Sequence, residues 1–185
     1  MSLPSTPAMR RIAFFGMFVS LSMVSACTVR PLYSNTPLSP GSTVTPAEQL
    51  ASISVKPVTT RYAQQVRNNL IFGLTRGAGQ PAVSAYSVDL AVKERIETTL
   101  VNQAGEDEDQ PRAGAVVLTA TYRLSDAKSG KQISTGTRSM SASFDRPLQE
   151  YATYRAQIDA ENRAARELAE ILQLSLAQDL ARHGS

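Results

Sequence analysis

The last part of the chain constrains the fold most, because one helical pattern runs through it almost without interruption. Apolar side chains recur there at spacings of three and four residues, namely at Tyr151, Tyr154, Ile158, Ala165, Leu168, Leu172, Leu176 and Leu180. Asp145 and Pro147 mark the start of this helix. A helix of roughly thirty residues is about 45 Å long, enough to cross a whole sheet. We therefore expect the helix to cross a β-sheet, with Tyr151 and Tyr154 packed in the core.

The middle of the chain alternates apolar and polar residues with a period of two. Residues 86–92 and 116–124 follow this pattern, which is typical of strands with one buried face. A polar loop at 102–112 separates them, and a turn cluster at 126–131 precedes a more polar strand at 132–144. Successive strands joined by short polar loops favour an antiparallel meander.

A shorter strand and helix precede this meander. Residues 52–58 alternate and predict a strand, in which Pro57 indicates an edge position or a termination. Thr59 or Thr60 can cap the helix that follows, whose apolar stripe is Ala63, Val66, Leu70 and Leu74. The element order is thus βαβββα. It predicts an α+β two-layer sandwich, with a four-stranded, mainly antiparallel sheet covered on one face by two helices.

The N-terminus has the features of a secretory signal. Arg10 and Arg11 precede an apolar run at 12–24, and small residues lead to Cys27, the single cysteine. The run is shorter than the about 20 residues of a transmembrane helix. The sequence before the cysteine resembles the lipobox of bacterial lipoproteins and comprises Val24, Ser25 and Ala26. That resemblance implies cleavage before Cys27 and acylation of this residue; a plain signal peptide with an incidental cysteine is the alternative.

We predict three parts: a signal peptide at 1–26, a lipidated arm at 27–51 and a single domain at 52–185. The arm is rich in Pro, Ser and Thr, which is typical of an extended linker or of an arm that lies on a surface. Loss of the signal removes Arg10 and Arg11 and lowers the formal net charge from +3 to about +1. A nearly neutral domain gives no reason to expect nucleic acid as a partner.

The sequence offers no constellation for catalysis, a cofactor or a metal. His183 is the single histidine and lies near the C-terminus, so a histidine-based acid–base pair is not expected. The acidic run at 106–109 lacks the glycine and the distal glutamate of a calcium loop. The glycines between 73 and 79 are not followed by the Lys-Ser/Thr of a phosphate loop. We therefore expect a protein that is not an enzyme.

Several segments, in the same order along the chain, resemble the LptE family of lipopolysaccharide-assembly lipoproteins. The run from Cys27 to Tyr33, Cys-Thr-Val-Arg-Pro-Leu-Tyr, is similar to the opening of the mature family members. Thr28 and Val29 depart from it, since glycine and an aromatic residue are common there. Further similar segments are the strand at 53–58, the helix at 61–70, the hairpin at 122–131 and the final helix at 150–169.

The resemblance implies an outer-membrane lipoprotein that plugs a β-barrel lipopolysaccharide translocon (LptD-like) and assists barrel assembly and lipopolysaccharide delivery to the outer leaflet. It implies a lipid anchor on the periplasmic face of the outer membrane. Thr28 agrees with this, because enterobacterial lipoproteins retained at the inner membrane often have Asp at this position. An auxiliary lipoprotein of a lipid-transporting ABC system is the alternative.

Two groups of residues are candidate contacts. Arg and Lys pair well with phosphate, so lipid A phosphates are candidate ligands of the hairpin residues Arg123, Lys128, Lys131 and Arg138. Ordinary solvated charges are the alternative for each of them. The second group either docks on the barrel wall or forms a stiff spacer, and it comprises Arg30, Pro31, Leu32 and Tyr33.

Overall fold

The computed structural model describes residues 45–99 and 113–183. Their elements are α2 (Pro46–Ala51), β1 (Ile53–Val55), α3 (Arg61–Thr75), β2 (Tyr86–Thr99), β3 (Ala113–Asp126), β4 (Gln132–Asp145) and α4 (Glu150–His183). The predicted order of four strands and two long helices is confirmed. The signal peptide, the lipobox, Cys27 and the run from Arg30 to Tyr33 lie outside the described residues.

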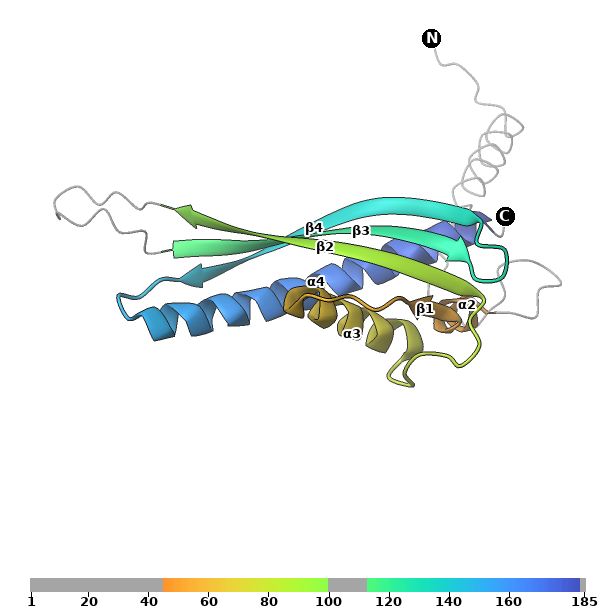
Figure 1. Ribbon diagram of the computed structural model, residues 1–185, viewed down its shortest axis with the longest axis horizontal. Coiled ribbons are helices and arrows are strands. Elements are labelled where there is room, and N and C mark those ends of the chain that lie inside the picture. The colour runs from red at the N-terminus through yellow and green to blue at the C-terminus, as the bar shows by residue number, and fades with distance from the viewer. Residues whose placement is uncertain (1–44, 100–112, 184–185) are drawn as a thin grey trace, which may run out of the picture. The chain divides into compact units, whose positions relative to one another are not determined.

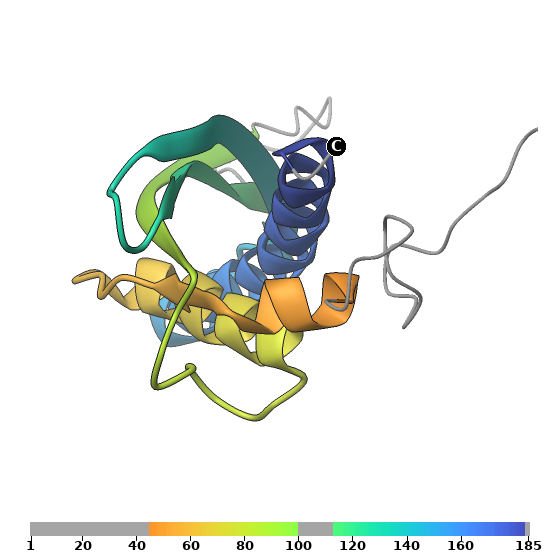
Figure 2. The same ribbon diagram turned by 90° about the vertical axis from the view of Figure 1, so that its right-hand side faces the viewer.

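The four strands form one sheet in the order β1-β2-β3-β4. β1 runs parallel to β2, because α3 carries the chain back between them, and the other two pairs are antiparallel. The mainly antiparallel sheet is therefore confirmed, with β1 at one edge. Figure 2 shows that the sheet is curved, with α3 and α4 on its inner side. We call the helix-facing side the inner face and the other side the outer face.

β1 is shorter than the strand predicted at 52–58. Its pairing with β2 ends near Lys56, whose backbone N–H donates to the Val88 carbonyl oxygen at 2.9 Å. Arg67 of α3 then binds the free end, since its Nε donates to the carbonyl oxygens of Val55 (3.2 Å) and Lys56 (3.0 Å). Pro57 follows and has no N–H to continue the ladder. A helix side chain thus takes over the hydrogen bonds that a longer strand would make.

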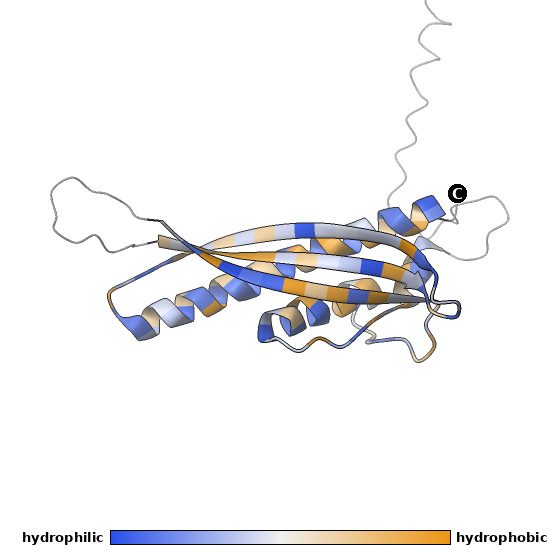
Figure 3. Cartoon of the chain, turned by 45° about the horizontal axis from the view of Figure 1, so that its top comes forward, coloured by the Kyte–Doolittle hydropathy of each residue, from blue (hydrophilic) through white to orange (hydrophobic). Residues whose placement is uncertain are grey.

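The core lies between the inner face and the two helices. Burial alternates along β3, where every second residue from Val116 to Leu124 is buried, and hydrophobic and hydrophilic bands alternate along the strands in Figure 3. α4 meets this face mostly with leucines and small alanines, which let a helix lie close to a sheet: Ala160, Ala164, Ala165, Leu168, Ala169, Leu172 and Leu176. The apolar stripe predicted for α3 is buried as expected.

Two glycines of the inner face each lie against an aromatic ring from the neighbouring strand. Gly136 is paired with Tyr122, and a Cβ atom added to it would lie 2.7 Å from the tyrosine Cε1. Gly114 is paired with Phe144, and a Cβ atom there would lie 2.6 Å from the phenylalanine Cζ. A ring over a strand glycine fills the space that a side chain would occupy. The two pairs therefore fix the packing of the β3–β4 hairpin at both of its ends.

One sequence prediction about packing was wrong. Tyr151 and Tyr154 are 75% and 58% exposed and do not pack in the core. They belong to the first turns of α4, which extend past the point where α3 begins and so have no neighbouring helix among the described elements (Figure 1). Residues 46–51, at the end of the predicted arm, form the short helix α2, with Thr45 as its cap.

Candidate functional site: the hairpin and the outer face of the sheet

The β3–β4 turn holds two of the candidate basic residues at an exposed tip. Asp126 Oδ1 accepts hydrogen bonds from the backbone N–H groups of Lys128 (3.1 Å) and Ser129 (2.7 Å). The backbone hydrogen bond from Ser129, the largest cause, and the hydroxyl of Ser129 lower the pKa of Asp126. Gly130 completes the turn with φ of 69°, a conformation that glycine adopts without strain. Lys128 and Lys131 are exposed on this fixed turn.

The other two candidates lie on opposite faces of the sheet. Arg123 is exposed on the outer face of β3, beside Asp89 of β2 in the strand register. Arg138 is half-buried on the inner face of β4, where its Nε donates to Ser175 Oγ of α4 at 2.8 Å. Its Nη1 donates to the Thr137 carbonyl oxygen, also at 2.8 Å. The fold therefore does not gather the four basic residues into one cluster, and it gives Arg138 a role in attaching α4.

A buried carboxylate that the sequence analysis missed joins the hairpin to the end of α4. Asp179 is 7% exposed, and its Oδ2 accepts hydrogen bonds from Tyr122 Oη and Ser134 Oγ, both at 2.7 Å. Its Oδ1 forms an ion pair with Arg182. Burial, followed by the hydrogen bond to Asp179 and the charge of that carboxylate, raises the pKa of Tyr122 to about 12. The sequence contained one signal for this buried carboxylate, because Asp179 lies between Leu176 and Leu180 of the apolar stripe.

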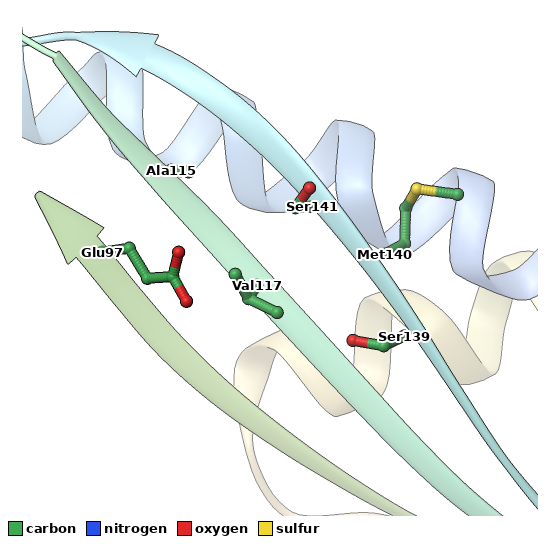
Figure 4. A pocket seen from close by; sticks show the side chains of 6 residues that line it. All are labelled: Glu97, Ala115, Val117, Ser139, Met140 and Ser141. Carbon is green, nitrogen blue, oxygen red and sulfur yellow. The ribbon is translucent and has the colours of Figure 1, made fainter. Parts of the chain in front are cut away.

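The outer face of the hairpin is rich in hydroxyl groups. Thr119 Oγ1 lies 3.0 Å from Ser139 Oγ, and Thr121 Oγ1 lies 3.2 Å from Thr137 Oγ1, so hydrogen bonds cross between the strands. Figure 4 shows an open hollow of about 280 Å³ on this side, lined by Glu97, Ala115, Val117, Ser139, Met140 and Ser141. Such a surface can dock against a polar partner.

A second surface, at the end of the sheet away from the β3–β4 turn, presents exposed apolar side chains and was also missed by the sequence analysis. Leu148, Tyr151 and Tyr154 are exposed around the start of α4, beside a hollow of about 570 Å³. Arg146 and Glu150 also line this hollow. In the described part of the chain no group of three or more His, Cys, Asp or Glu side chains is arranged to hold a metal ion. Across the same residues, no helix is long and apolar enough to cross a membrane.

Comparison with known families decides the family. The family described as LptE, lipopolysaccharide-assembly, matches residues 50–176, which cover all four strands and both long helices apart from the last turns of α4. The chain belongs to the LptE family. The resemblance drawn from the sequence is thereby confirmed, and the role of this LptE-family protein is that of a lipopolysaccharide-assembly lipoprotein of the cell envelope. The family is a non-catalytic one.

Solved structures agree with this assignment. A lipoprotein from Caulobacter crescentus is 27% identical and superimposes with a TM-score of 0.60, covering 74% of this chain and 96% of its own. Rare lipoprotein B from Shewanella oneidensis is 12% identical with a TM-score of 0.53, covering 72% of this chain and 97% of its own, and it supports the fold alone. No curated protein matches the sequence.

Proposed function

We propose that this LptE-family protein is anchored in the outer membrane and plugs a β-barrel lipopolysaccharide translocon of the LptD type. It would assist assembly of the barrel and delivery of lipopolysaccharide to the outer leaflet. The family match over residues 50–176 is the observation that carries this proposal. The finer parts of it, the barrel partner and the outer-membrane anchor, rest on the properties of the family and on the chemistry of the surface.

The outer face of the sheet supports enclosure by a barrel. The lumen of a large outer-membrane barrel is polar, whereas its lipid-facing side is apolar. Five successive outward residues of β4 are small and hydroxylated: Thr135, Thr137, Ser139, Ser141 and Ser143. Such side chains can hydrogen-bond to a polar wall without leaving a buried charge unpaired. We therefore assign the outer face of β3 and β4 to the barrel wall.

Co-purification from the native host tests the proposal. Extraction of the full-length protein in mild detergent should recover a large barrel protein in a one-to-one complex. Replacing Thr121 with Arg on the outer face should lower the recovery, whereas the same replacement at exposed Gln178 of α4 serves as the matched control. Recovery of an ATPase complex without a barrel would contradict the proposal and favour an auxiliary lipoprotein of an ABC system.

Cys27→Ser should abolish acylation, because the thiol is the group that receives the diacylglycerol in lipoproteins. Cells labelled with radioactive palmitate should show label in the wild-type protein and none in the variant. Several buried acyl chains anchor a protein stably, so the variant should also leave the membrane fraction. Label that persists in Cys27→Ser would place the acyl site elsewhere and remove this anchor from the proposal.

Lys128 and Lys131 are the proposed contacts for lipid A phosphates, because both are exposed at the tip of a fixed turn. Replacing both with Gln should weaken lipopolysaccharide binding about tenfold, the effect of losing about 1.4 kcal/mol of charge-assisted hydrogen bonding. Binding to immobilised lipopolysaccharide measures the change. Lys93→Gln together with Arg95→Gln on β2 is the control for net charge. Equal losses in the two double variants would indicate that the interaction depends on total charge and not on the turn.

A further inference from the structure

Three charged side chains from three elements meet where the helices join the sheet. Arg61 begins α3, and its Nη2 lies 2.6 Å from Glu161 Oε2 of α4. Its Nη1 donates to Asn162 Oδ1 at 3.3 Å. Glu161 is only 6% exposed. Charged side chains are rarely buried to this extent unless they are paired. Glu94 of β2 is the third member, and its carboxyl lies within hydrogen-bonding reach of Glu161.

The oxygen atoms of the two carboxyl groups are not all satisfied. Oε1 of Glu94 and Oε1 of Glu161 are both buried, and neither accepts a hydrogen bond from the residues that the structure describes. Ionised carboxylates only accept hydrogen bonds, so two of them side by side cannot satisfy each other. One proton changes this, because a carboxylic acid donates to the neighbouring carboxylate. A buried polar atom without a partner is costly, and this proton supplies the partner.

The surrounding charges also favour a proton. Glu161 of α4 and Arg61 of α3 are the charged groups that act on Glu94, and across the sheet its neighbour on β3 is the fully buried Leu118. Lys93 and Arg95 flank Glu94 but alternate to the outer face. Two carboxylates and one guanidinium carry a net charge of −1, and a shared proton makes the group neutral. Burial, followed by the charge of Glu161, raises the pKa of Glu94, while Arg61 opposes this rise.

We infer that Glu94 and Glu161 share one proton, and that this proton bonds β2 to α4 and makes the attachment of the helix to the sheet depend on pH. The bond lies at the point where α4 passes the start of α3 (Figure 1). The turns of α4 that precede Glu161 have no neighbouring helix among the described elements. Deprotonation therefore places two like charges at the point where side chains of both β2 and α3 reach α4.

The direction of the pH dependence follows from the raised pKa of Glu94. A carboxyl group that binds its proton more tightly in the folded protein stabilises the fold below its unfolded pKa. This contribution is lost as the pH rises through the higher pKa of the folded protein. The interaction between Glu94 and Glu161 therefore stabilises the attachment of α4 to β2 at low pH and weakens as the pH rises.

The first test observes the proton directly in the full-length protein in detergent. Carbon-13 NMR of labelled glutamate carboxyl groups should show Glu94 titrating above the ordinary pH range of a glutamate. Titration of Glu94 within the ordinary range would overturn the inference. Because this measurement uses the wild-type protein, it does not depend on any variant folding correctly.

The second test compares the thermal stability of Glu94→Gln with that of Glu97→Gln. Glu97 is the control because it is an exposed glutamate on the other face of β2. The amide that Glu94→Gln introduces can donate to Glu161 without a proton to lose, so the thermal midpoint of this variant should fall less than that of the wild type as pH rises. Glu97→Gln should follow the wild-type curve. Parallel curves for all three proteins would overturn the inference. So would a midpoint that calcium chloride raises in the wild type and not in Glu94→Gln, because a metal ion would then occupy the position of the proton.

Discussion

Replacing Leu168 with Asp should destabilise the domain by more than about 4 kcal/mol, the largest effect expected for a single substitution in this chain. Leu168 is fully buried on the inward side of α4. Loss of the leucine leaves a cavity, and the carboxylate must either remain charged without a partner or take up a proton. Urea unfolding of the wild type and the variant measures the change in the free energy of unfolding.

Leu174→Asp is the matched control for this substitution. Leu174 lies on the same helix but is 45% exposed, so the carboxylate introduced there stays in contact with water. We expect a loss of about 1 kcal/mol or less at this position. Similar losses for the two variants would show that Leu168 is not in the core and that the buried face of α4 is wrongly assigned.

Replacing Asp179 with Ala should destabilise the protein by about 3 kcal/mol, because it leaves buried hydroxyl groups without an acceptor. Tyr122 Oη and Ser134 Oγ both donate to the same carboxylate oxygen, at 2.7 Å. Hydrogen bonds to a charged group are each worth about 1.5–3 kcal/mol, and removal of the acceptor exposes the full cost of the orphaned donors. Asp159→Ala is the control, since Asp159 forms an exposed ion pair with Arg163 on the same helix. It should cost about 1 kcal/mol or less.

The same substitution should change the titration of Tyr122. The folded protein raises the pKa of Tyr122 to about 12, so the phenol contributes stability below its ordinary pKa and loses it as pH rises through the folded value. Without the carboxylate at 179, the hydrogen bond and the charge that raise the pKa are gone, and tyrosinate should form at a lower pH. Spectrophotometric titration, with Tyr122→Phe to identify the signal, measures this shift. An unchanged titration would mean that burial alone sets the pKa.

The error in the prediction for Tyr151 and Tyr154 arose because their burial depends on a distant neighbour. The spacing of Tyr151 and Tyr154 matches the apolar stripe of α4. The first turns of α4 extend past the start of α3, however, so α3 does not cover the two tyrosines. α2 was overlooked for a local reason. Thr45 and Glu48 form a capping box, with Pro46 at the first helical position, and this start signal is present in the sequence.

By itself the sequence determined the local elements and the resemblance to a family. Apolar periods predicted three strands and both long helices, and the turn cluster at 126–131 predicted the hairpin and the more polar strand that follows it. Thr59 and Thr60 were the candidate caps of α3, and the structure uses Thr60. These features depend on residues within a few positions of one another, so a single sequence contains the information needed to predict them.

Only the tertiary structure decided which polar groups meet in the interior. Glu94, Glu161 and Arg61 come from three elements, as do Tyr122, Ser134 and Asp179. Their contacts depend on the register of the sheet and on the position of α4 across it. A register shift of one residue would turn each strand side chain to the other face, and a periodic pattern alone does not say which residue of one strand faces which residue of a helix.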